Sequence, residues 1–140
     1  MSAPISKFMT RETRCVAPET PVGDAWSLMR AHSLRHLPVV TEGKVVGILS
    51  QRDLLALEAG LAVDRSATPV SDAMTTDPYV VAPNEPLASV VATMALRKLG
   101  SAVVVLAGRP IGIFTTTDAL HVLGRLLRRA QDREREGAPE

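Results

Sequence analysis

The chain has 140 residues, of which 46% are hydrophobic and 22% are charged, and its formal net charge at pH 7 is +1. These proportions are typical of one globular domain, and the small charge excludes a strong field toward nucleic acid or membranes. Cys15 is the single cysteine, which excludes an intrachain disulfide and a CxxC metal site. No apolar run approaches the roughly 20 residues of a membrane span, and the first residues lack a signal-peptide core, so we expect a cytoplasmic protein.

The first half of the chain predicts helices alternating with strands. The expected elements are a short helical lead-in at 5–9, an extended piece at 15–17, a helix beginning near 20, strands at 37–40 and 44–50, and a helix from about 52 to 60. Thr20 is the expected N-cap and Pro21 the first helical residue. Glu42 and Gly43 predict the hairpin turn. A buried helical stripe is expected from residues at helical spacing, namely Val22, Ala25, Trp26 and Met29.

The second half predicts the same order. Its expected elements are a lead-in helix at 70–74, a strand at 79–82, a helix at 86–98, a hairpin at 102–115 and a helix from Thr117. Asn84, Glu85 and Pro86 mark the helix start, and Ala107 and Gly108 mark the hairpin turn.

An internal repeat accounts for this recurrence. Sliding the sequence by 65 residues aligns positions 5–55 with 70–120 without a gap, and sixteen of the aligned pairs are identical. We therefore divide a single module, 1–140, into a first repeat at about 5–57, a linker at 58–69 and a second repeat at about 70–127. Each repeat is a βαββα unit too small to bury its own sheet face, so the sequence predicts an α/β (α+β) fold with the two units packed about a pseudo-two-fold axis.

A short motif inside the repeat carries the candidate chemistry. Residues 47–53 read GILSQRD and residues 112–118 read GIFTTTD. Each copy predicts a strand end, a hydroxyl at Ser50 or Thr115, and an acid in the first helical turn at Asp53 or Asp118. Helix-start N–H groups favour anions, and a fixed carboxylate accepts the hydroxyl protons of a ribose. The acids could instead only stabilise their helices, but that reading leaves unexplained the hydroxyl three residues earlier.

The repeated segments LRHLPVV…GKVVGILSQRDLL and LGSAVVV…GRPIGIFTTTDAL resemble a tandem pair of cystathionine-β-synthase (CBS) domains, the Bateman module, over about residues 5–127. The resemblance implies two repeats packed through their sheets, with two clefts between them. It also implies a regulatory ligand containing adenosine, such as AMP, ADP, ATP, NAD(H) or S-adenosylmethionine, and modules that pair into homodimers. No cofactor is required.

By the same resemblance, each cleft is built from both repeats. One is expected to combine Ile113, Thr115, Thr117 and Asp118 with Arg35, His36, Leu37 and the segment 10–16. The other is expected to combine Ile48, Ser50, Arg52 and Asp53 with Ser101, Ala102 and the segment 75–81. The aspartates would hold ribose hydroxyls and the isoleucines would lie against the adenine. Phosphate would be contacted by Thr117, Arg35, His36 or Arg52.

Three functions compete. The first is a regulatory module that binds an adenosine-containing nucleotide and signals to a protein partner that the sequence does not identify. The second is a structural dimerisation module with vestigial clefts. The third, an enzyme, is not expected, because no Ser-His-Asp, Cys-His or carboxylate pair stands out. Nucleic acid is an unexpected partner because aromatic residues are scarce, and no membrane contact is expected.

The last helix continues beyond the repeat. Leu120, Leu123, Leu126, Leu127 and Ala130 share one side of it. The simplest interpretation is a helix docked by this stripe, with its arginines in solvent, and the alternative is a contact with another subunit or an anionic partner. From about 132 to 140 we expect a disordered tail.

Several side chains allow two interpretations. Arg52 suits either a phosphate or a surface acid. Trp26 suits core packing or a dimer contact better than cofactor stacking. His32 and His36 are four residues apart, but His36 falls beyond the helix and further ligands are missing, so no metal site is expected.

Overall fold

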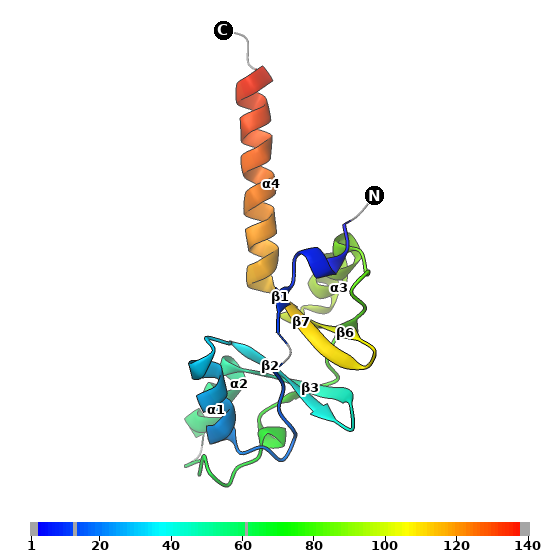
Figure 1. The fold of residues 1–140 in the computed structure, drawn as a ribbon. Helices are drawn as coiled ribbons and strands as arrows, with labels where there is room; N and C mark the ends of the chain where they lie inside the picture. The colour runs from blue at the N-terminus through cyan, green and yellow to red at the C-terminus, as the bar shows by residue number, and fades with distance from the viewer. Residues whose placement is uncertain (1–2, 13, 61, 138–140) are drawn as a thin grey trace.

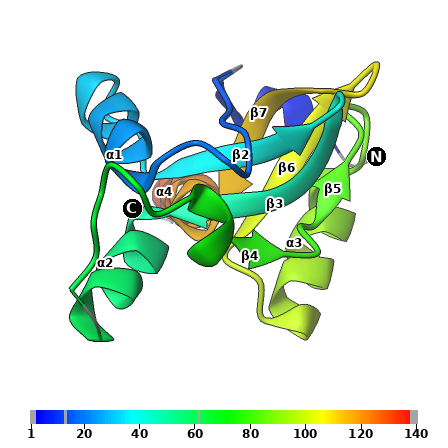
Figure 2. The same ribbon diagram turned by 90° about the horizontal axis from the view of Figure 1, so that it is seen from below.

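Each half of the chain forms a β-hairpin with one helix before it and one after it (Figures 1 and 2). The computed structural model describes residues 3–12, 14–60 and 62–137. The first half contains α1 (Val22–Ala31), β2 (His36–Thr41), β3 (Lys44–Ser50) and α2 (Gln51–Gly60). The second contains α3 (Leu87–Arg97), β6 (Ser101–Leu106), β7 (Arg109–Thr115) and α4 (Thr116–Gly137). The short strands are β1 (Thr10–Arg11), β4 (Thr75–Thr76) and β5 (Val80–Val81), and single 3₁₀ turns occupy Ile5–Lys7 and Val70–Asp72. This arrangement confirms the mixed α/β fold and both hairpins.

The two halves exchange strands. β1 pairs antiparallel with β7, with Thr10 opposite Ile113, and β4 pairs antiparallel with β3, with Thr75 opposite Ile48. The strand orders are therefore β1-β7-β6-β5 and β2-β3-β4. Both pairings obey the 65-residue offset of the sequence, which confirms the pseudo-two-fold relation.

The lead-in segments also cross to the opposite half. The amide of Ile5 donates to the carbonyl of Glu85 at 2.8 Å, and the equivalent amide of Val70 donates to the carbonyl of Thr20 at 2.8 Å. Ile5 lies fully buried in the core that contains Phe114, and Val70 lies fully buried in the core around α1. The spatial halves therefore differ from the sequence repeats, because each takes its first segment from the other.

Two glycines let the exchanged segments approach the hairpins. A Cβ at Gly112 would lie 2.5 Å from Sδ of Met9 and 2.9 Å from the carbonyl oxygen of Thr10. A Cβ at Gly47 would lie 2.7 Å from Sδ of Met74 and 3.0 Å from the carbonyl oxygen of Thr75. Because one of the two close atoms in each case is backbone, a side-chain movement alone cannot make room.

The sheets also meet through apolar side chains. Ile48, Val103 and Ile113 form a buried cluster, against which Val45 and Val105 pack. These five residues come from β3, β6 and β7, so the hairpins of the two repeats touch each other directly. The cluster confirms the expected packing of the repeats through their sheets.

The starts of α1 and α3 differ from the prediction. Pro21 and Pro86 are the N-cap residues, in extended conformation and without a side-chain cap, so neither is the first helical residue. The hydroxyl of Thr20 instead accepts a hydrogen bond from the amide of Ala17 at 3.0 Å. Proline suits this position because the N–H that it lacks would have no intrahelical partner at the start of a helix.

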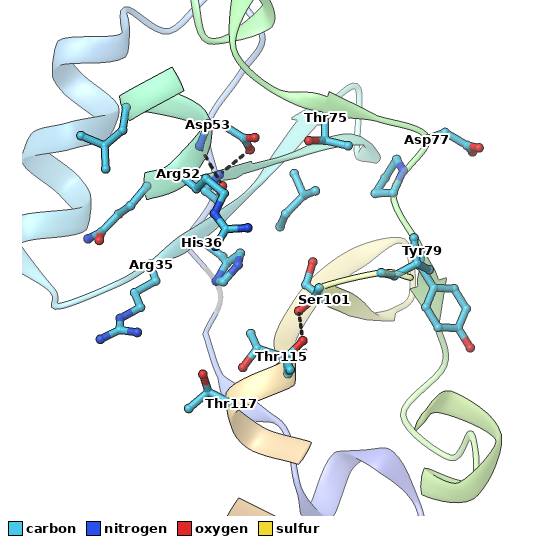
Figure 3. A pocket seen from close by; sticks show the side chains of 18 residues that line it. Arg35, His36, Arg52, Asp53, Thr75, Asp77, Tyr79, Ser101, Thr115 and Thr117 are labelled. Atoms are coloured by element: carbon cyan, nitrogen blue, oxygen red, sulfur yellow. Dashed lines mark hydrogen bonds between the residues drawn. The ribbon is translucent and has the colours of Figure 1, made fainter. Parts of the chain in front are cut away.

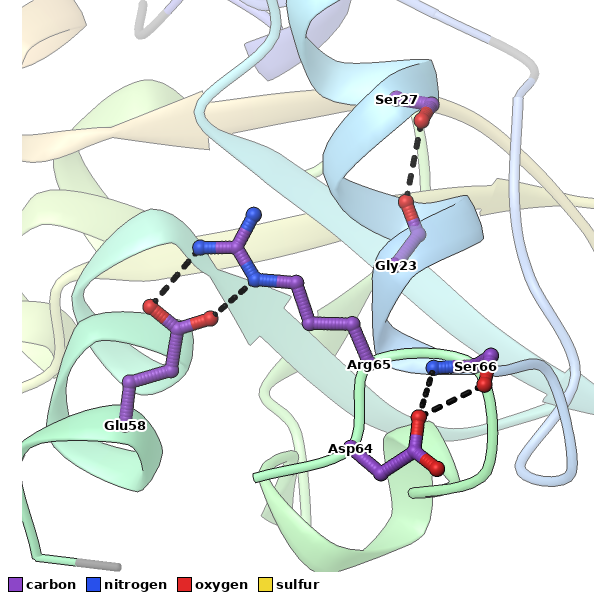
Figure 4. Close-up of polar contacts among 6 residues, drawn as sticks. All are labelled: Gly23, Ser27, Glu58, Asp64, Arg65 and Ser66. Carbon is purple, nitrogen blue, oxygen red and sulfur yellow. Dashed lines mark hydrogen bonds and ion pairs between the residues drawn. The ribbon is translucent and has the colours of Figure 1, made fainter. Parts of the chain in front are cut away.

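The described part of the linker, which excludes residue 61, is folded against the first half (Figure 4). Arg65 forms an ion pair with Glu58 of α2, with Nε 2.6 Å from Oε1, and its guanidinium lies 5.8 Å from the centre of the Trp26 ring. A Cβ at Gly23 would lie 2.9 Å from the carbonyl oxygen of Arg65, so the linker backbone passes close to α1. Trp26 packs on the core with Val22, Ala25 and Met29, as the helical stripe predicts.

The last helix is longer and less covered than predicted. α4 continues to Gly137, so the tail expected to be disordered from 132 is helical as far as 137, and residues 138–140 lie outside the described part. No residue of α4 is buried, and Figure 1 shows the helix extending away from the two sheets. The prediction that the leucine stripe docks on the rest of the chain is therefore wrong.

Replacing Gly112 by alanine should destabilise the fold. Forcing a methyl group into the packed backbone crossing should lower the free energy of unfolding by about 1–3 kcal/mol, measured by urea denaturation. The matched control is Gly60→Ala, because a Cβ there meets no atom within 4 Å and alanine favours a helix by up to about 1 kcal/mol.

Adding Met9→Ala to Gly112→Ala distinguishes the two close contacts. The smaller side chain removes the clash with sulfur but leaves the carbonyl oxygen of Thr10 in place, so little stability should return. Equal stability of Gly112→Ala and Gly60→Ala would contradict the close crossing.

Candidate functional site

Both motif aspartates close a hydrogen-bonded ring at the start of a helix. The amide of Ser50 donates to Oδ2 of Asp53 at 2.9 Å, and the amide of Asp53 donates to Oγ of Ser50 at 3.0 Å. Thr115 and Asp118 form the same reciprocal pair at 2.9 and 3.2 Å. This is a capping box, and it explains why a hydroxyl stands three residues before each acid. The spacing of the motif therefore has a structural cause that the sequence analysis missed.

The two carboxylates differ in how many bonds they already accept. Asp118 also accepts from the hydroxyl of Thr115 at 3.1 Å and from the hydroxyl of Thr10 at 3.2 Å. Thr10 belongs to the exchanged strand β1, so this last bond joins the two repeats. A carboxylate has about four acceptor sites, which leaves Asp53 with more free acceptor capacity than Asp118.

The larger cleft has a volume of about 560 Å³ and lies beside Asp53. Figure 3 shows side chains of the first repeat facing those of the second across it. Of the residues that the sequence assigned to this cleft, five line it, namely Ile48, Ser50, Arg52, Asp53 and Ser101. The exchanged segment 75–79 supplies one wall through Thr75, Asp77, Pro78 and Tyr79.

The smaller cleft has a volume of about 270 Å³ and lies beside Asp118. Its lining includes six residues that the sequence assigned to it, namely Arg35, His36, Ile113, Thr115, Thr117 and Asp118. Thr10 and Glu12 come from the segment predicted at 10–16, of which residue 13 lies outside the described part. Both repeats therefore contribute to this cleft as well.

The two clefts share one wall. Arg35, His36, Thr115 and Thr117 line both of them. The family resemblance places these four residues in the Asp118 cleft alone. An anion in either cleft would therefore meet the same arginine and histidine.

Burial lowers the pKa of His36 below its ordinary value of 6.5. The carboxylates of Asp53 and Asp118 act in the opposite direction and raise this pKa, while the neighbouring Arg35 lowers it. The imidazole therefore lies under the influence of both motif acids, consistent with its position between the two clefts. A bound phosphate would add a further negative charge beside it and favour the protonated ring.

Two predicted site residues do not reach a cleft. Leu37 and Ala102 are both fully buried, Leu37 in the core of the first half and Ala102 in that of the second, and neither lines a cleft. Successive side chains of a strand point to opposite faces. His36 and Ser101 therefore face the clefts, whereas the residue after each faces the helices.

Other lining residues were not singled out from the sequence. Gln51 and Leu55 of α2, Thr116 of α4 and Ser33 before β2 all line a cleft. Gln51 and Thr116 each follow the hydroxyl residue of the repeated motif. Their equivalent positions in the two repeats could therefore have identified them as candidate site residues. Tyr79 is the single tyrosine of the chain, and the guanidinium of Arg97 lies 5.6 Å from the centre of its ring.

The structure adds two observations about metal ions and membranes. In the described ranges, no three histidine, cysteine or acidic side chains come together as a metal site would need. His32 follows α1 and is exposed, whereas His36 begins β2, as the repeat alignment predicted. Across residues 3–12, 14–60 and 62–137, every helix is too short or too polar to cross a bilayer.

Comparison with known proteins gives consistent matches. The sequence pattern of the CBS domain matches residues 5–60 and again 70–125. An inosine-5'-monophosphate dehydrogenase of Korarchaeum cryptofilum is 34% identical over 117 residues, which is 81% of this chain and 23% of the dehydrogenase. This chain thus spans about a quarter of that relative.

Two solved structures are also similar. The AcuB protein of Vibrio cholerae superimposes with a TM-score of 0.73 and 31% identity, over 99% of this chain and all of that one. CBSX2, solved in complex with AMP, gives a TM-score of 0.72 and 28% identity over 88% of this chain and 97% of that chain. Two domain matches that together cover most of the sequence, joined by this shared fold, place the chain in the CBS domain family with two copies of the domain in tandem.

Proposed function

We propose that this chain is a regulatory module that binds an adenosine-containing nucleotide between its two CBS domains and signals to a partner protein. The observation that carries the proposal is the larger cleft, which both repeats line and which places Asp53 near Arg35, His36 and Arg52. A volume of about 560 Å³ lies within the range of small-molecule sites. The AMP complex of CBSX2 supports the same ligand class.

The proposed roles follow from the chemistry of the lining. Asp53 accepts one hydrogen bond from Ser50, so its remaining acceptor sites can receive the two ribose hydroxyls. Arg35 and Arg52 are exposed guanidinium groups, which suit phosphate because they form paired contacts. Ile48 offers an apolar edge to the base. We therefore assign the Asp53 cleft as the principal site.

The module would signal because the ligand contacts both repeats at once. A nucleotide held by both repeats binds more tightly to one relative arrangement of the repeats than to others, and so shifts their population toward it. The partner protein would recognise that arrangement. We further propose that the module acts as a homodimer and that its role is regulation rather than catalysis.

A second candidate is a structural module with vestigial clefts. The capping boxes favour it, because they explain Asp53 and Asp118 without any ligand. In that case, changing either aspartate should alter the stability of the fold, but no nucleotide should bind to the unaltered chain.

Calorimetric titration with AMP should distinguish the two candidates. We expect the unaltered chain to bind AMP, and Asp53→Asn to weaken binding at least tenfold, which is about 1.4 kcal/mol. Asp118→Asn should weaken it less, because the carboxylate of Asp118 already accepts three hydrogen bonds within the chain.

The matched control is Asp24→Asn, an exposed acid in the first turn of α1 that lines neither cleft. It loses a charge at a helix start, as the test variants do, and should bind AMP normally. Absence of AMP binding to the unaltered chain would favour the second candidate, and equal weakening by all three variants would contradict a role for Asp53 in the site.

The lowered pKa of His36 predicts a stability that depends on pH. Between the folded-state pKa and 6.5 the unfolded chain binds more protons than the folded chain, so the free energy of unfolding should fall as the pH drops below 6.5. His36→Gln should reduce this fall, and the exposed His32→Gln should not. Denaturation curves between pH 5 and 8 measure both.

AMP should act on the same group. The negative phosphate favours the imidazolium form, so the pKa of His36 should rise on binding, as followed by NMR titration of its ring protons. A pKa of His36 that is the same with and without saturating AMP would contradict phosphate contact at the shared wall.

A further inference from the structure

The α4 helix carries an apolar stripe that no other part of residues 3–12, 14–60 and 62–137 covers. Over its 22 residues, at 1.5 Å per residue, the helix is about 33 Å long. The leucines at 120, 123, 126 and 127 are respectively 62%, 49%, 56% and 56% exposed. Their spacing of three and four residues places them along one side. Ala130 continues the stripe toward the C-terminus.

We propose that the stripe is an interface between two copies of this chain, whose α4 helices pack antiparallel. Apolar residues repeating at alternate steps of three and four form the seam of a two-helix coiled coil. Leu120, Leu123, Leu127 and Ala130 follow this pattern through four consecutive seam positions. The proposal assigns a surface to the homodimer but does not depend on nucleotide binding.

A membrane surface fits the helix less well. Helices that lie on membranes combine a strongly basic polar face with large apolar residues, tryptophan or phenylalanine among them. Between 116 and 137 the sequence has no aromatic residue other than His121, and Asp132, Glu134 and Glu136 alternate with its arginines. Glu134 also lies seven residues after Leu127, so an acid continues the line of the stripe.

The same glutamate selects the direction of the pairing. In a parallel pair with aligned helices, Glu134 would lie against the partner's Glu134, and like charges at such a position repel. In an antiparallel pair centred near residue 125, Glu134 would instead lie opposite the partner's Thr116. Thr116 carries no charge, and its hydroxyl donates to the carbonyl of Gly100 at 3.4 Å, so the antiparallel arrangement removes the repulsion between the two glutamates.

The sizes of the apolar residues agree with this direction. Centring the antiparallel pair near 125 places Leu123 against the partner's Leu127, and Leu120 against the partner's Ala130. Each of these pairs of facing seam residues then contains at least one leucine, whereas a parallel pair would place Ala130 against the partner's Ala130. Leu126 would lie beside the partner's Leu126 close to the two-fold axis and extend the apolar contact.

Sedimentation velocity over a hundredfold range of protein concentration tests the interface. We expect the unaltered chain to approach twice the monomer mass at the upper end, and Leu123→Glu/Leu127→Glu to remain monomeric throughout. The matched control is Leu96→Glu on α3, because Leu96 is 85% exposed and should not affect the mass. Circular dichroism of each variant checks that the chain still folds.

Other outcomes overturn the proposal in different ways. A monomer at every concentration would remove both the homodimer and this interface. A dimer that persists in Leu123→Glu/Leu127→Glu would keep the homodimer and place it on another surface. Co-sedimentation of a monomeric chain with phosphatidylserine vesicles, lost in the same variant, would assign the stripe to a membrane instead.

Disulfide trapping tests the direction of the helices. In a Cys15→Ser background, Leu126→Cys should form a disulfide-linked dimer readily under mild oxidation, because residue 126 meets its own copy near the axis. Glu134→Cys should not, because in an antiparallel pair the two copies of residue 134 lie far apart. Ready crosslinking through residue 134 and none through 126 would overturn the antiparallel arrangement.

Discussion

The exchange of short backbone segments between the two repeats is the constraint on which the structure depends. β1 of the first repeat completes the sheet of the second, and β4 of the second completes the sheet of the first. The crossing is possible because Gly47 and Gly112 present no side chain where Thr75 and Thr10 pass. Backbone hydrogen bonds and close packing thereby link the repeats, and neither half has a complete core without the other.

The clefts follow from the same exchange. The segment that crosses from one repeat to the other also forms a wall of the cleft beside the hairpin that it joins, as Thr10 and Thr75 do. Each cleft therefore contains side chains of both repeats even without a ligand. His36 and Thr115 belong to both clefts, so occupation of one would change the electrostatic field in the other. This geometry suits a module whose output depends on how its repeats are held together.

Much of the fold could be predicted from the sequence, because the two repeats predict the same elements independently. Each hairpin and helix was expected twice, and the 65-residue offset predicted which residues of the two repeats occupy equivalent positions. The family resemblance placed the segments 10–16 and 75–81 beside the motif of the opposite repeat. The strand pairing that exchanges them was not predicted, since a repeat in sequence does not say which copy a short strand will join. The stripe of α4 likewise predicted a buried contact, but periodicity alone does not say whether the covering surface lies in the same chain.

The sequence predicted many of the residues that line the clefts, but not the direction of every side chain or the hydrogen bonds of the two aspartates. The alternation of strand residues explains why His36 and Ser101 reach the clefts while Leu37 and Ala102 face the cores. The capping boxes show that a motif can have a structural cause and still leave a carboxylate with free acceptor sites. How many such sites remain at Asp53 and Asp118 depends on three-dimensional neighbours such as Thr10, which the local sequence does not reveal.

The proposed regulatory role requires a nucleotide between the repeats, against Asp53. The most direct test is the change in backbone amide NMR signals of the isotope-labelled chain during titration with AMP. We expect shifts that saturate together at the start of α2 around Asp53 and at the start of β6 around Ser101, because one ligand contacts both repeats. Shifts confined to one repeat, or none at saturating AMP, would contradict a nucleotide site shared by both repeats.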